Sequence, residues 1–130
     1  MRAFWLSATF LFSFTGLSFA QQNQQKVCSQ VTDVCVSYSS STPFVFNKEA
    51  QFTLTIQDAD NAEIQLVKVD LWMEMGNHGH GSSPLKVTPK SSELYEITKA
   101  YFVMKGNWQI RVTYKHEDFQ ETLLLLAQVY

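Results

Sequence analysis

The sequence predicts an all-β fold, namely an immunoglobulin-like β-sandwich of about seven antiparallel strands. Three observations support this prediction. Apolar and polar residues alternate along several segments, turn residues separate those segments at short intervals, and no stretch holds a sustained helical period between capping residues. The Cys…Trp…Cys spacing of true immunoglobulin domains is missing, so the pattern indicates the architecture rather than that family.

The strands follow from the alternation. It is clearest over 51–57, 67–75, 108–115 and 119–130, and weaker over 34–38, 85–88 and 94–104. Turn residues at 58–61, 106–107 and 117–118 separate these segments. Because the residues before Val67 alternate in the opposite phase, we expect a β-bulge near Leu66 and Val67.

Residues 1–20 have the order of a secretory signal peptide. Arg2 gives a positive start, an uncharged apolar run follows from Ala3 to Leu17, and Ser18-Phe19-Ala20 forms a small-x-small cleavage site. The apolar run is shorter than the ~20 residues of a membrane-spanning helix, although a retained anchor is the alternative. We therefore expect export to the periplasm or secretion, with no membrane attachment after cleavage.

The remaining chain is expected to be one domain. The polar residues 21–27 are predicted to form a flexible lead-in, and residues 28–130 a single β-sandwich domain. The formal net charge is −2 and there is no basic cluster, which argues against binding to nucleic acid or to anionic membranes. No nucleophile motif or acid–base pair is recognisable, so we do not expect an enzyme.

Cys28 and Cys35 are the two cysteines of the chain. In an exported protein an even number of cysteines indicates a disulfide, which would close a loop of about eight residues here. A thiolate metal site is the alternative, but six intervening residues are not a usual spacing for zinc or for redox chemistry.

One segment, 73–81, interrupts the strand pattern with the sequence Met-Glu-Met-Gly-Asn-His-Gly-His-Gly. The three glycines predict a loop with unusual backbone angles. Thioether sulfur prefers monovalent copper, and imidazole binds either oxidation state of copper. We therefore expect a Cu(I) site, with five candidate ligands: Met73, Met75, His78, His80 and, at the end of a later strand, Met104.

These residues resemble the YtkA-like and FixH-like family of small exported or membrane-tethered β-sandwich domains, over about Pro43 to Val129. Two motifs carry the resemblance. Met75, Gly76, His78 and Gly79 match the family's loop with Asn77 inserted, and Met104, Gly106 and Trp108 match its second motif. The resemblance implies copper handling and, for the FixH branch, assembly of cytochrome oxidase. Met73 stands one position closer to Met75 than is usual, and His80 is an additional histidine.

The leading hypothesis is a periplasmic copper-binding protein, a carrier, chaperone or tolerance factor that exchanges Cu(I) with another envelope protein. Trp72 would then either shield the metal from solvent or be a packed aromatic residue at the sheet edge. The alternative is a metal-free interaction module that binds an envelope protein through the Gly/His loop and Trp72. A third hypothesis is a zinc-bound structural loop, which needs His116 to reach the other two histidines.

Overall fold

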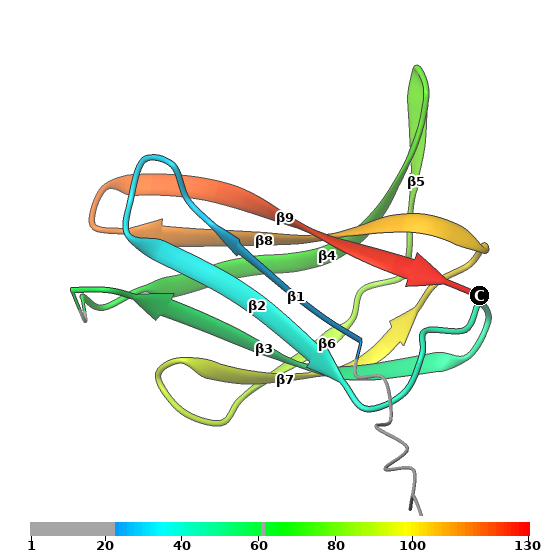
Figure 1. Cartoon of the computed structure of the whole chain (residues 1–130), viewed down its shortest axis with the longest axis horizontal. Helices are drawn as coiled ribbons and strands as arrows, with labels where there is room; N and C mark the ends of the chain where they lie inside the picture. Colours follow the sequence, from blue (N-terminus) through cyan, green and yellow to red (C-terminus); the bar gives the residue numbers. More distant parts are fainter. Residues whose placement is uncertain (1–22, 61) are drawn as a thin grey trace, which may run out of the picture.

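The computed structural model describes residues 23–60 and 62–130, and the predicted signal peptide lies outside this part. The described part is all-β and forms a sandwich of two sheets (Figure 1). Its nine strands are β1 (Asn23–Cys28), β2 (Val34–Ser40), β3 (Glu49–Asp58), β4 (Gln65–Met75), β5 (His78–Gly81), β6 (Lys86–Pro89), β7 (Leu94–Tyr101), β8 (Gly106–His116) and β9 (Phe119–Val129). None of these residues belongs to a helix that is long and apolar enough to cross a membrane.

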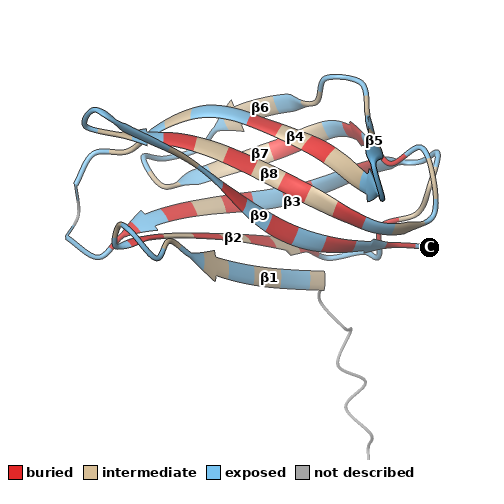
Figure 2. Cartoon of the chain, turned by 90° about the horizontal axis from the view of Figure 1, so that it is seen from above, coloured by how far each residue is buried: buried red, intermediate tan, exposed pale blue. Residues whose placement is uncertain are grey.

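The strands pair antiparallel within each sheet. One sheet has the order β1-β2-β3-β7-β6, and the other has the order β5-β4-β8-β9. The predicted alternation is visible as burial, because every second residue of β2, β3, β8 and β9 points into the core (Figure 2). The largest fully buried side chains are Trp108, Tyr114, Phe44 and Phe102. The sandwich prediction is confirmed.

The sequence also located a bulge correctly. The register of β4 against β8 shifts between Leu66 and Lys68, which is the position where the apolar phase changes. The bulge lets Val69 and Leu71 face the core, where both are buried. Since Met73 and Met75 follow in the same phase, the bulge also decides which face of β4 carries the two methionines.

The expected flexible lead-in over 21–27 is wrong for the residues that the structure describes. Asn23–Cys28 form β1, an edge strand whose every residue pairs with β2. The side-chain oxygen of Gln25 also accepts a hydrogen bond from the backbone N–H of Leu126 in the other sheet. The side chain of Gln25 thus satisfies a backbone group, although the segment has no apolar alternation to indicate a strand.

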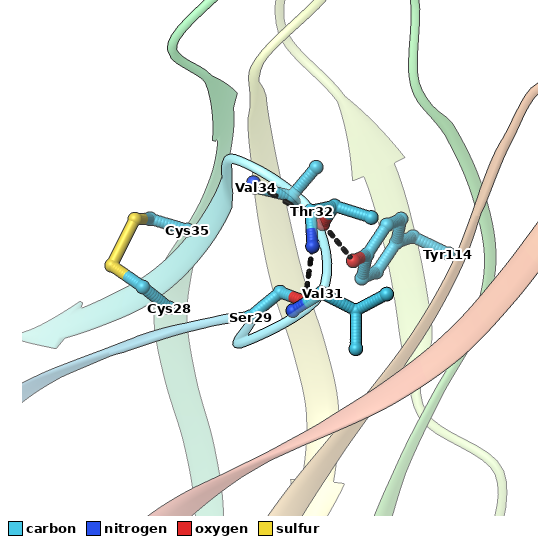
Figure 3. The surroundings of a disulfide bond; sticks show 7 residues. All are labelled: Cys28, Ser29, Val31, Thr32, Val34, Cys35 and Tyr114. Carbon is cyan, nitrogen blue, oxygen red and sulfur yellow. Dashed lines mark hydrogen bonds between the residues drawn. A yellow bond between two sulfur atoms is a disulfide. The ribbon is translucent and has the colours of Figure 1, made fainter.

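Cys28 and Cys35 lie directly opposite each other in β1 and β2 and form a disulfide, with 4.0 Å between their Cα atoms (Figure 3). The turn between the two strands has its own hydrogen bonds. The hydroxyl of Ser29 accepts bonds of 3.0 Å from the backbone N–H groups of Val31 and Thr32, and the Thr32 hydroxyl is bonded to Tyr114. The disulfide thus links the two strands of a hairpin whose turn is already ordered by hydrogen bonds.

Candidate metal centre

Segment 73–81 is a β-hairpin rather than the predicted irregular loop. Strand β4 ends at Met75 and β5 begins at His78, so Gly76-Asn77 form a two-residue turn. Gly76 has a φ of 72°, which suits a glycine at the first central position of a type II′ turn. The signal that sequence reasoning missed was this Gly-Asn pair, because a two-residue turn of that kind predicts a hairpin.

The register of the hairpin brings four of the five candidate ligands onto one face. Met75 lies opposite His78, and Met73 lies opposite His80. Residues directly opposite in an antiparallel pair point to the same side, as do alternate residues along one strand. The two thioethers and the two imidazoles therefore share a face, and this face continues the core-facing side of β4.

Exposure increases along this face toward the tip of the hairpin. Met73 packs against the core and is half-buried, whereas 37% of Met75 is exposed and both histidines are exposed. The imidazole rings lie edge to face with their centroids 5.9 Å apart. His78 Nδ1 is 3.0 Å from Oδ1 of Asn77. The tip extends beyond the two sheets, so the histidines are open to solvent (Figure 1).

Met104 belongs to the connection between β7 and β8, and the side chain of Met73 reaches Gly106, the first residue of β8 after this connection. A Cβ placed on Gly106 would lie 2.7 Å from Cε of Met73, so the methionine end packs directly against the glycine. Met104 is half-buried against the core, and its carbonyl oxygen accepts a 2.9 Å hydrogen bond from the indole N–H of Trp108. The fifth candidate is therefore two residues from the point where the hairpin meets the connection.

Trp72 lies on the opposite face of the hairpin from the candidate ligands, which fits a packed aromatic residue at the sheet edge rather than a shield over the metal. It pairs with Gly81, in alternation with the ligand positions. A Cβ placed on Gly79 would lie 2.4–2.7 Å from three atoms of the indole ring, so the ring covers that glycine. The Gly-His-Gly-His-Gly pattern thus places histidines on one face and leaves room for an indole on the other.

Charged side chains surround Trp72 on this outer face. The guanidinium carbon of Arg111 lies 4.5 Å from the centre of the Trp72 ring, and the indole N–H donates a 2.8 Å hydrogen bond to Glu74. Arg111 in turn donates two hydrogen bonds, of 2.7 and 2.6 Å, to Asp70. This bidentate pair holds the pKa of the Asp70 carboxyl below its ordinary value.

His116 lies far from the hairpin and cannot complete a three-histidine site. Strand β8 begins at Gly106, near the hairpin, and ends at His116, which places the two ends on the order of 30 Å apart. His116 Nε2 is 3.4 Å from the buried carboxylate of Asp58. The zinc hypothesis in its three-histidine form is therefore wrong.

Within residues 23–60 and 62–130, no group of three or more His, Cys, Asp or Glu side chains is arranged to hold a metal ion. The face of the hairpin that carries the candidate ligands offers only His78 and His80 of these residue types, because Glu74 points to the other face, and its other candidate donors are thioethers. The donor set therefore fits a soft monovalent ion, for which thioether sulfur is a suitable ligand, and does not fit zinc.

Comparison with known proteins identifies the family. A family model described as YtkA-like matches residues 29–113, which is more than half of the chain, so the chain belongs to the YtkA-like family. The matched region includes the whole hairpin and the connection that carries Met104. Comparisons with curated proteins and with solved structures gave no match. The FixH-like part of the resemblance and the association with copper remain predictions.

Proposed function

We propose that this YtkA-like protein binds Cu(I) outside the cytoplasm, as a carrier, chaperone or tolerance factor, and that the β4–β5 hairpin is the binding site. The observation that carries the proposal is the register of the hairpin. It places Met73 opposite His80 and Met75 opposite His78, so that two thioethers and two imidazoles face the same side.

The chemistry of the donors favours the monovalent ion. Cu(I) is soft and accepts thioether and imidazole ligands, whereas thiolates would be its strongest protein ligands. Both cysteines are joined in a disulfide, and no free cysteine occurs among the described residues. Methionine and histidine are therefore the soft ligands that the described part of the chain offers, and the hairpin concentrates them.

The gradient of exposure suits a protein that gives up its metal. Met73 is half-buried against the core, whereas His80 opposite it and His78 beside the turn are both exposed. A partner protein could replace the exposed imidazoles first while the half-buried thioether still holds the ion. We accordingly propose that the partner is another envelope protein that donates or accepts copper.

The proposed location rests on two features. Residues 1–20 have the organisation of a signal peptide. The disulfide between Cys28 and Cys35 is of the kind that persists in oxidising compartments such as the periplasm or the extracellular space.

Titration with Cu(I) under anaerobic conditions, in competition with a chromogenic chelator, tests the proposal. The protein should withdraw one equivalent of Cu(I) from the chelator, and the double variant His78→Ala/His80→Ala should lose this ability. His116→Ala is the matched control, because it removes a histidine at the far end of β8 and should leave Cu(I) binding unchanged. Unaltered binding by the double variant would exclude the hairpin as the site.

The metal-free interaction module is the alternative that the same experiment examines. The observation in its favour is that β5 is an edge strand, exposed at its tip and paired on one side only. If the wild-type protein does not compete for Cu(I), the module becomes the better hypothesis. Crosslinking from the hairpin tip in the envelope would then identify what it binds.

A further inference from the structure

We infer that Trp72 is a positioning residue for the hairpin. Its indole packs on Gly79 from the outer face and thereby holds β5 in the register that places His78 and His80 opposite the two methionines. The role in metal binding rests on the proposed function, whereas the role in ordering β5 is independent of it.

The fit between Trp72 and Gly79 is close. A Cβ on Gly79 would lie 2.4 Å from Cζ2, 2.6 Å from Cε2 and 2.7 Å from Nε1 of the indole, separations that real Cβ atoms do not adopt. Gly79 does not have a positive φ, so backbone conformation does not require glycine at this position. The indole is what requires it, because only a hydrogen fits beneath the ring.

The indole cannot easily turn away, because its surroundings hold it. Glu74 accepts a hydrogen bond from its N–H group at 2.8 Å, and the Arg111 guanidinium lies 4.5 Å from the ring centre. Arg111 is itself fixed by two hydrogen bonds to Asp70. The ring therefore belongs to a chain of contacts that runs from the neighbouring strand β8, across β4, to β5.

β5 needs such support. It has four residues and, among the strands that the structure describes, pairs with β4 alone at the edge of its sheet. Short two-stranded segments are marginally stable in water unless side chains pack on them. His78 and His80 flank Gly79 and point to the other face, so loss of the indole contact would leave their positions relative to the methionines undefined.

Gly79→Ala tests the inference, and Gly81→Ala is its matched control. Both glycines lie in β5 without a positive φ, but a Cβ at position 81 would be 3.8 Å from the indole, which is ordinary contact. In wild type and Gly81→Ala, NMR should show contacts between the Trp72 ring and residue 79 together with slow exchange of the β5 amides. Gly79→Ala should lose those contacts, and its β5 amides should exchange about tenfold faster or more.

Rescue separates positioning from a general loss of structure. Phe lacks Cζ2, the indole atom nearest to a Cβ at position 79, and it has no N–H group to bind Glu74, so its smaller ring can shift away. Trp72→Phe in the Gly79→Ala background should therefore restore part of the protection. Cu(I) affinity measured by chelator competition should fall at least tenfold in Gly79→Ala, stay unchanged in Gly81→Ala and recover partly in the double variant.

The outcomes distinguish this inference from the proposed function. If the wild-type protein binds no Cu(I), the proposed function fails, and exchange of the β5 amides alone decides whether Trp72 positions the hairpin. If Gly79→Ala keeps wild-type protection, or loses protection while wild-type protein and variant bind Cu(I) equally well, Trp72 does not position the ligands and the inference is overturned.

Discussion

Gly106→Ala should be strongly destabilising, for two reasons that can be measured separately. Gly106 has a φ of 125°, in a region that residues with a Cβ rarely adopt. The added Cβ would also lie 2.7 Å from Cε of Met73, the methionine that joins the hairpin to the β7–β8 connection. One substitution therefore strains the backbone and displaces a candidate ligand.

The magnitude follows from the two contributions. Holding a residue with a Cβ at such a backbone angle costs about 1–3 kcal/mol. Displacing the half-buried methionine from the core forfeits about 1 kcal/mol more, since full burial of such a side chain stabilises by roughly 1.5–3 kcal/mol. The free energy of unfolding should therefore fall by about 2–4 kcal/mol, which is a large fraction of the stability of a domain of this size.

Urea unfolding followed by the fluorescence of buried Trp108 provides the assay. Gly76→Ala is the backbone control, because Gly76 also has a positive φ, 72°, but a Cβ added there would have nothing within 4 Å of it. It should cost only about 1–2 kcal/mol. In a double-mutant cycle, Gly106→Ala should cost about 1 kcal/mol less in a Met73→Ala background, where the clash is absent. Equal costs in both backgrounds would refute the steric part of the reasoning.

Three further predictions concern stability. Replacing Cys28 and Cys35 with Ser should lower the free energy of unfolding by about 2–3 kcal/mol, as expected for a disulfide that closes a loop of about eight residues. Urea titrations measure this change. A decrease below about 0.5 kcal/mol would mean that the ordered turn alone constrains the hairpin. The hydrogen bonds from Arg111 lower the pKa of Asp70, so this carboxylate stabilises the fold above its unfolded pKa of about 4, and the contribution disappears as pH falls through the lower folded pKa. Asp70→Asn should therefore be less stable than wild type at pH 7, and the difference should shrink as pH falls from 4 toward 2. A constant difference across urea titrations over that range would contradict the ion pair. Burial raises the pKa of Tyr114, so the wild-type protein should lose stability as pH rises above about 10. Tyr114→Phe should be less stable than wild type at pH 7 by about 1 kcal/mol, but it should lose less stability above pH 10. Parallel pH profiles of the two proteins would rule this out.

The alternation of side chains predicted most of the sandwich because burial on one face of a strand leaves a period of two in the sequence. Phe52, Leu54 and Ile56 alternate visibly, and all three are buried in β3. Strand β1 was missed because its sequence does not alternate between apolar and polar residues. Asn23 and Gln25 are polar, and the pairing of their strand depends on the disulfide and on contacts with β2 and β9.

The candidate ligands were recognised by residue type, but their arrangement was not. The glycines suggested an irregular loop, and only Gly76 uses a positive φ there. Gly79 accommodates the ring of Trp72, a reason that cannot be read locally because the position of the ring depends on Arg111 in another strand. The register between β4 and β5 brings the candidate ligands onto one face, and the bulge in β4 opposite β8 decides which face that is.

The two faces of the hairpin can therefore be altered separately by substitution. The histidines alternate with the glycines, so substitutions at 78 and 80 change the donors, whereas a substitution at 79 changes the indole contact without removing a donor. At the base, Met73 touches Gly106 and thus links the donors to the connection that carries Met104. If copper binds as proposed, a partner must approach from the exposed tip of the hairpin. How strongly the protein retains the ion should then depend on the packing of Met73. Variants at 79 and 106 should accordingly alter Cu(I) retention without changing any ligand, which a site made of an unstructured loop would not predict.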